Sequence, residues 1–132
     1  MDFSSLVLVE KDKSTGFIGK ELGSFEVNDG ALYVRKFFVL DGEVNIYFDT
    51  NKDVEEWEYS AIYDLFNVEI FVENGFIVEY DEEEFNPTFI LKIAYNEDYE
   101  KMKDILNKAI DLIKQEMENV FVAILGKEKD YE

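Results

Sequence analysis

The sequence ALYVRKFFVLDGEVNIYFD at residues 31–49 contains two runs of strand-forming residues separated by Asp41-Gly42. Asp-Gly supplies the two positive-φ positions of a type I′ turn, so this stretch predicts a β-hairpin with a two-residue loop. Apolar and polar residues alternate in the second run, which is typical of a sheet with one face in water. The loop also sets the register, and we expect these cross-strand pairs: Leu40 with Glu43, Val39 with Val44, Phe37 with Ile46 and Arg35 with Phe48.

Four segments outside the hairpin also have the pattern of strands. Two precede it at residues 3–10 and 17–27, and two follow it at residues 76–80 and 88–95. Pro87 stands at the entry of the last segment, where its missing N–H donor is harmless. Together with the hairpin, these segments predict a sheet of about six strands.

Two segments have helical periodicity. Asp53 and Glu56 have the spacing of a capping box and open an expected helix over residues 54–66. A longer helix is expected to begin at Asn96 as its N-cap, because apolar residues then recur at spacings of three and four. Gly126 stands where the C-terminal cap of this helix belongs.

Residues 68–73, just before Asn74-Gly75, are ambiguous. They fit either a strand that enters a second type I′ hairpin or a short helical turn that Gly75 ends in a left-handed conformation. We favour the helical turn.

The order of these elements, ββββ-α-ββ-α, predicts the fold class. Strands that are neighbours in sequence and joined by short turns usually pair antiparallel. We therefore expect an α+β fold, in which a short middle helix and a long C-terminal helix pack on one face of an antiparallel sheet of about six strands. With 132 residues and no visible linker or repeat, the chain should form a single domain over residues 1–132, with a frayed tail from about 127.

Charge and composition restrict the function classes. The chain has 31 Asp and Glu against 13 Lys and Arg, a formal net charge of −18, and it contains no His and no Cys. The missing residue types exclude His-dependent catalysis, Cys-His nucleophiles, disulfides and the usual zinc sites. The negative charge disfavours nucleic acid and membrane as partners and favours a basic protein. Neither a signal sequence nor a spanning segment is visible, so we expect a cytoplasmic location, and no cofactor is indicated.

One candidate cation site follows the hairpin. Asp49, Asn51 and Asp53 match the D-x-N-x-D opening of a calcium loop, in which oxygens at alternate positions converge on one ion. The match fails downstream, because Val54 replaces the turn glycine and Ser60 replaces the bidentate glutamate. A polar turn that leads into a helix explains the same residues, so we favour that interpretation and assign no metal site.

Two other features could bind a charged ligand or partner. Arg35 is expected on the apolar face of the hairpin, where it could contact an anionic ligand, although an ion pair or a cation–π contact is favoured. The run Asp81–Glu84 could recruit cations or a basic partner, but such runs are most often solvated loops. We therefore keep Arg35 as a possible ligand contact and treat the acidic run as a loop.

The end of the long helix is apolar around its whole circumference. Residues 120–125 read VFVAIL, and successive residues of a helix are about 100° apart, so they cannot all face one core. The end of the helix either plugs the core and is buried on every side, switches to a strand, or is covered by a partner. For the last alternative we expect Phe121, Ile124 and Leu125 to form an interaction surface, and we expect a homodimer through it.

The chain also resembles a known family. The residues that carry the resemblance are VRKFFVLDGEVNIYFDTNKDVEEWEYSAIYDLF at 34–66 and NPTFILKIAY at 86–95. At these residues the chain resembles an uncharacterised family of small acidic bacterial proteins, a domain of unknown function. The resemblance implies no catalytic or binding residue.

Two classes of function remain open. The acidic surface and the apolar helix end favour a non-catalytic, cytosolic protein-interaction or regulatory module. The alternative is a small-ligand-binding protein or a weak carboxylate-based enzyme with a site between the sheet and the helices, since two carboxylates suffice for glycoside hydrolysis. No catalytic or cofactor-binding residue can be assigned, and we lean against an enzyme.

Overall fold

The hairpin at Asp41-Gly42 is present in the computed structural model, which describes residues 4–12 and 14–131. Its strands are β3 (Val34–Leu40) and β4 (Glu43–Asp49), and they pair antiparallel. The φ angles of Asp41 and Gly42 are 53° and 79°, the left-handed conformation that a type I′ turn requires. The expected register is confirmed for three pairs: Leu40 with Glu43, Val39 with Val44, and Phe37 with Ile46.

The fourth expected pair, Arg35 with Phe48, is wrong. The register shifts between Val34 and Lys36, so that Val34 pairs with Phe48 and Arg35 is the extra residue of a bulge. The bulge allows an apolar side chain to face Phe48, which is fully buried. Arg35 is thereby excluded from the apolar face and lies exposed at the surface.

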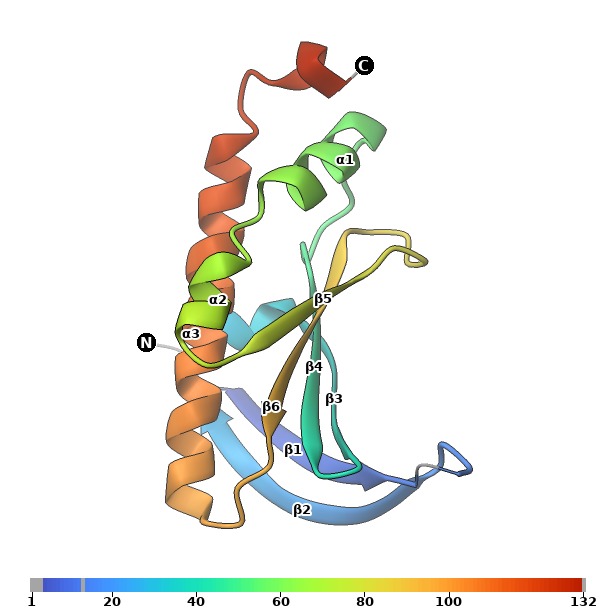
Figure 1. The fold of residues 1–132 in the computed structure, drawn as a ribbon, viewed down its shortest axis with the longest axis vertical. Helices are drawn as coiled ribbons and strands as arrows, with labels where there is room; N and C mark the ends of the chain where they lie inside the picture. The colour runs from blue at the N-terminus through green and yellow to red at the C-terminus, as the bar shows by residue number, and fades with distance from the viewer. Residues whose placement is uncertain (1–3, 13, 132) are drawn as a thin grey trace.

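The sheet has six strands, as expected, but it is mixed. Its strand order is β2-β1-β3-β4-β6-β5 (Figure 1), with β2 and β5 at the two edges. β1 pairs with β3 in parallel, and the other neighbouring pairs are antiparallel. The remaining strand bounds are β1 Ser4–Lys11, β2 Ile18–Val27, β5 Ile77–Asp81 and β6 Thr88–Ala94.

The expectation of a purely antiparallel sheet is wrong because of the segment between β2 and β3. The sequence pattern begins a strand at Ala31, whereas the chain forms the 3-10 helix η1 (Asp29–Tyr33) there. η1 carries the chain from β2 past β1. β3 therefore pairs with β1 on the side opposite to β2 and does not pair with β2. Three residue pairs connect β1 to β3 in the parallel arrangement.

The helices agree with the expected order and differ at their starts. Their bounds are α1 Glu56–Leu65, α2 Glu69–Glu73 and α3 Tyr99–Ala123, followed by the 3-10 helix η2 at Glu128–Tyr131. α1 is capped by Glu55, whose backbone N–H donates to Glu58 Oε1 over 2.9 Å, and not by Asp53. α3 is capped by Asp98, whose side chain accepts from the backbone N–H of Lys101, and not by Asn96, whose side chain accepts from the backbone N–H of Asp98.

The ambiguous segment at residues 68–73 is helical, which confirms the favoured alternative. α2 is followed by Gly75 with a φ of 85°, the left-handed conformation that ends a helix. The segment after Gly126, expected as a frayed tail, contains η2, and the hydroxyl of Tyr131 donates to the carboxylate of Asp64 on α1. In the described part of the chain, no helix combines the length and the apolar character needed to cross a membrane.

The core lies between the sheet and the helices and is filled by aromatic rings. Phe48 of β4 and Phe89 of β6 have ring centroids 5.3 Å apart, and Phe66 lies 4.3 Å from Phe89. One face of α3 closes the core with a row of buried side chains: Met102, Leu106, Ala109, Ile110, Ile113, Met117 and Val120. The interior is therefore packed with side chains where a site between sheet and helices was considered.

Gly30 brings η1 unusually close to α3. A Cβ atom at this position would lie 2.5 Å from the backbone oxygen of Ile110 and 2.9 Å from its Cγ2. On the same side, Asn107 of α3 accepts from the backbone N–H of Asn28 and donates to the backbone oxygen of Glu26, each over 3.1 Å. The crossover from β2 to β3 is thus pressed against the long helix, and this contact leaves no room for a side chain.

Gly30→Ala should lower the free energy of unfolding by about 1–3 kcal/mol, the usual cost of added volume in a packed contact. Urea denaturation followed by circular dichroism would measure the loss. Gly19→Ala is the matched control, because its Cβ would meet the backbone oxygen of Glu10 at 3.3 Å, a milder contact. Equal losses at the two glycines would contradict the close approach at Gly30.

Candidate functional site

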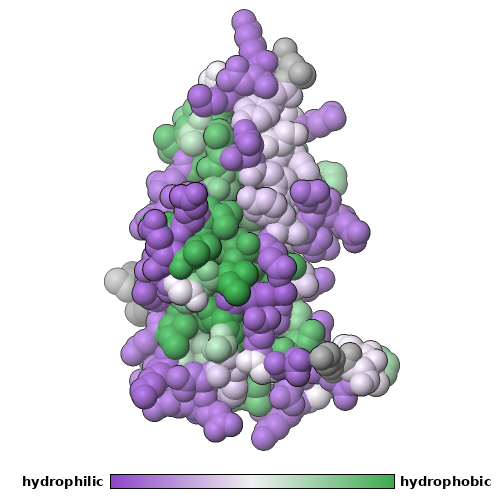
Figure 2. Space-filling view, viewed as in Figure 1, coloured by the Kyte–Doolittle hydropathy of each residue, from purple (hydrophilic) through white to green (hydrophobic). Residues whose placement is uncertain are grey.

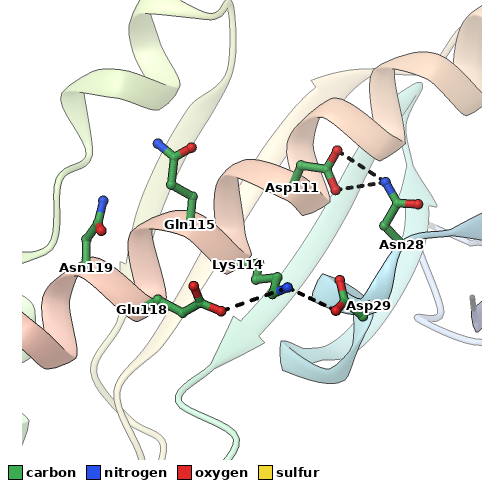
Figure 3. Close-up of a pocket in the computed structure, with 7 residues that line it drawn as sticks. All are labelled: Asn28, Asp29, Asp111, Lys114, Gln115, Glu118 and Asn119. Carbon is green, nitrogen blue, oxygen red and sulfur yellow. Dashed lines mark hydrogen bonds and ion pairs between the residues drawn. The ribbon is translucent and has the colours of Figure 1, made fainter. Parts of the chain in front are cut away.

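A polar hollow of about 450 Å³ lies between η1 and α3 (Figure 3). Its lining residues are Asn28, Asp29, Asp111, Lys114, Gln115, Glu118 and Asn119. The Nδ2 atom of Asn28 donates to both carboxylate oxygens of Asp111, over 2.9 and 3.2 Å. Lys114 Nζ lies 2.9 Å from Asp29 Oδ2. These contacts join η1 to α3 beside the Gly30 contact.

The electrostatics of this hollow do not make Asp29 a general acid. The hydrogen bond from Lys114 holds the pKa of the Asp29 carboxyl below its ordinary value, and the same bond raises the pKa of Lys114. A general acid at neutral pH needs a raised carboxyl pKa, which is the opposite shift. The carboxylate of Glu116, which is buried, accepts from the amides of Gln115 and Asn119. The polar groups of the hollow form hydrogen bonds and ion pairs with one another, and these contacts hold η1 against α3.

The structure brings Arg35 together with two residues of the candidate cation site. Arg35 Nε donates to Asp49 Oδ1 over 2.8 Å, and its Nη2 atom donates to Asn51 Oδ1. Asp49 Oδ1 also accepts from the backbone N–H of Asn51 over 2.8 Å. The guanidinium of Arg35 thus binds the oxygens that a calcium ion would need. Asp53 is not part of this cluster, since it accepts from Asn86 Nδ2.

Among the residues that the structure describes, no three acidic side chains are grouped in a way that could hold a metal ion. The turn after β4 is instead held by hydrogen bonds. Thr50 Oγ1 donates to the backbone oxygen of Lys52 over 2.6 Å, and Asn51 has a φ of 57°, which Asn tolerates better than most residues. This geometry directs Lys52 toward the end of α3, where its Nζ lies over the ring of Phe121.

The acidic run Asp81–Glu84 begins at the last residue of β5, and its backbone is held by tyrosines of α1. Tyr59 donates to the backbone oxygen of Glu82 over 3.1 Å, and Tyr63 donates to that of Asp81 over 2.9 Å. Burial raises the pKa of Tyr63, so its hydroxyl stays protonated and able to donate. The side chains of Glu82, Glu83 and Glu84 remain exposed, as the sequence indicated.

The apolar end of α3 is divided between the core and the surface. Ile124 is 2% exposed and belongs to the core, because it continues the buried row of the helix, so it is not part of a free surface. Phe121 is half-buried. Val122 and Leu125 are 68% and 73% exposed. Of the three expected interaction residues, Phe121 and Leu125 remain accessible, and Val122 joins them.

These side chains border a hollow that we call the α1–α3 groove. It measures about 390 Å³, and its lining residues are Lys52, Trp57, Glu58, Phe121, Val122, Ile124, Leu125 and Gly126. Lys52 Nζ lies 4.1 Å from the centroid of the Phe121 ring, a cation–π distance. Trp57 Nε1 donates to Glu55 Oε2 over 2.8 Å. Sequence reasoning missed Trp57 and Lys52 as groove residues, because both are far from Phe121 along the chain.

A second apolar surface is visible in Figure 2, where hydrophobic side chains gather over α2 and the start of β5. Val72 and Ile77 are 61% and 57% exposed there. Exposed Glu69 and Glu73 lie on the same short helix. The acidic surface of the protein is therefore interrupted by more than one apolar patch, and the α1–α3 groove is a hollow with aromatic side chains in its lining.

The comparison with protein families gives a match over the whole chain. The sequence model of a family of unknown function (DUF6762) matches residues 1–132. Neither the curated proteins nor the solved structures that were compared with the chain gave a match.

The ion pair between Asp29 and Lys114 should stabilise the fold in a pH-dependent way. The folded-state pKa of Asp29 is lowered, so its contribution is present above the ordinary value of 3.8 and is lost as the pH falls through the folded-state pKa. Asp29→Asn should therefore reduce the urea midpoint at pH 7, and the reduction should shrink as the pH falls below about 4. In a Lys114→Met background, the same substitution should show little pH dependence. A reduction that is equal at pH 7 and pH 3 would contradict this role of Asp29.

Proposed function

The chain belongs to this family of unknown function over residues 1–132, and we propose that it acts as a non-catalytic protein-binding module. The proposed docking surface is the α1–α3 groove. The proposed partner is a segment with basic and apolar residues on one side of a helix.

The exposure of Val122 and Leu125 carries this proposal. Both are more than two-thirds exposed, and they lie beside the half-buried rings of Trp57 and Phe121. Burying an aliphatic side chain that is otherwise in water is worth roughly 1.5–3 kcal/mol. Two such side chains next to aromatic rings form the kind of apolar centre that a protein partner covers. A groove between two helices suits a helical ligand.

Charge supports a basic partner. Glu58 lines the groove, exposed Glu55 and Glu56 lie at the start of α1, and exposed Glu118 lies one turn before Val122. The chain as a whole has a formal net charge of −18. An acidic rim attracts a basic segment and speeds its association. A second copy of the chain has the same net charge, so the two copies repel each other. The homodimer expected from the sequence would use the same groove and is therefore the competing occupant.

The chemistry of the groove supports binding over catalysis. Glu58 is the carboxylate among its lining residues, and its Oε1 atom accepts from the backbone N–H of Glu55. Hydrolysis by carboxylates needs a facing pair, one as acid and one as base or nucleophile. The aliphatic and aromatic side chains that make up most of the lining can bury apolar surface but cannot transfer a proton.

Trp57 allows a direct test, because it is the one tryptophan of the chain and lies in the groove. The probe is an amphipathic Lys/Leu peptide of about 14 residues, long enough to form a helix when bound. Its titration at moderate salt should change the Trp57 fluorescence with saturation. A peptide with Glu in place of each Lys should bind much more weakly, because the groove has an acidic rim.

Leu125→Asp and Val122→Asp should each weaken peptide binding at least about tenfold, equivalent to 1.4 kcal/mol. Val72→Asp is the matched control: it removes an exposed aliphatic side chain of α2, outside the groove, and should leave the affinity within about twofold. Circular dichroism would confirm that each variant is folded. Equal losses in all three variants would show that binding does not depend on the groove and would contradict docking there.

Light scattering at about 100 μM protein tests the competing occupant in the same preparation. A monomer that binds the basic peptide agrees with the proposal. A dimer that Leu125→Asp converts to a monomer would assign the groove to a second copy and overturn the proposal of a basic partner.

A further inference from the structure

We infer that the ring of Phe121 is a subsite for a lysine or arginine side chain of the partner, and that Lys52 occupies this subsite in the unbound protein. The inference rests on the proposed docking function of the α1–α3 groove. It adds two points: the residue that enters the groove at Phe121 is cationic, and binding must first displace Lys52 from the ring.

The first step is the contact that the protein makes with itself. Lys52 Nζ lies 4.1 Å from the centroid of the Phe121 ring, well within the range of about 6 Å in which a cation is attracted to an aromatic face. Phe121 is half-buried and lines the groove, so its ring is fixed by packing while part of it stays accessible. The ring therefore already binds an ammonium group in the absence of a partner.

The second step is the way in which Lys52 is presented. Lys52 belongs to the turn after β4, whose conformation is set by the left-handed Asn51 and by the bond from Thr50 Oγ1 to the backbone oxygen of Lys52. Arg35 holds this turn through Asp49 and Asn51. The residues that resemble the opening of a calcium loop thus fix the backbone from which Lys52 extends. The backbone is held, but the exposed side chain of Lys52 is free to leave the ring.

The third step is the surroundings of the ring. Glu58 lines the same hollow, and the Glu55 carboxylate is fixed beside it by the bond from Trp57 Nε1. A cationic side chain that replaces Lys52 meets both an aromatic face and the negative charge of these carboxylates, whereas an apolar side chain there would gain nothing from that charge. Val122 and Leu125 border the same groove and need apolar partners. The matching ligand places a Lys or Arg about one helical turn from a Leu or Val.

Lys52 therefore competes with the ligand, and removing it should raise the affinity for the Lys/Leu peptide. Lys52→Ala should strengthen binding about two- to fivefold more than Lys127→Ala, a factor that follows from the usual strength of an exposed cation–π contact. Lys127 is the matched control, since it follows Gly126 of the groove lining and carries the same charge. Its substitution measures the general gain from removing one positive charge near the groove.

A second readout follows the displacement itself. In the free protein, the aromatic ring should shift the NMR signals of the Lys52 ε-methylene protons upfield, and saturating peptide should return them to ordinary values. Phe121→Leu should abolish the upfield shift and the difference between Lys52→Ala and Lys127→Ala. A peptide in which each lysine is acetylated should no longer displace Lys52.

The outcomes separate this inference from the proposed function. Peptide that binds through Val122 and Leu125 while the Lys52 signals stay upfield, or equal gains for Lys52→Ala and Lys127→Ala, would overturn the subsite and leave the docking groove intact. Failure of the wild-type protein and of Lys52→Ala to bind the peptide at all would overturn both.

Discussion

The close approach of η1 to α3 at Gly30 is the constraint on which the rest of the fold depends. The hairpin of β3 and β4 joins the β1–β2 hairpin through three residue pairs between β1 and β3. Such a short parallel connection is weak by itself, because parallel pairing is slightly less stable per residue. The long helix supplies what the sheet lacks: it packs across the core and is bonded to the crossover through Asn107, Asp111 and Lys114. The two halves of the sheet are thus held together by the helix that covers them.

Cations are scarce in this chain, and several of them connect parts that are distant in sequence. Lys114 joins α3 to η1, Arg35 joins β3 to the turn after β4, and Lys52 joins that turn to the end of α3. Each such contact also lowers the repulsion among the 31 acidic residues in its neighbourhood. At these three sites positive charge connects parts of the protein to one another, and the net charge that a partner meets is negative.

Local sequence patterns predicted the helices and strands well. Where a prediction is wrong, the reason is packing between parts of the chain that are distant in sequence. Asp41-Gly42 gave the hairpin and three of its pairs, because turn chemistry and alternation act over a few residues. The apolar neighbours of Ala31 continue into β3 and so predict a strand there, because nothing local shows that α3 presses on Gly30. The groove followed the same rule. The exposure of Leu125 could be inferred from helical geometry, whereas Trp57 and Lys52 reach it from other elements, and Ile124 is buried by packing that the sequence does not reveal.

The sheet has two open edges, and the acidic residues of the chain have a further effect there. β2 and β5 each have one side without a neighbouring strand, and apolar side chains are exposed near both, at Ile18 and Ile77. Such edges invite pairing between molecules unless charge prevents it. On β5 the charged groups are the carboxylates of Glu79 and Asp81, and Lys92 of β6 forms an ion pair with Glu79. Charged side chains on an open strand disfavour the addition of a strand from a second molecule, so the acidic residues that attract a basic partner also oppose edge-to-edge pairing of the sheet.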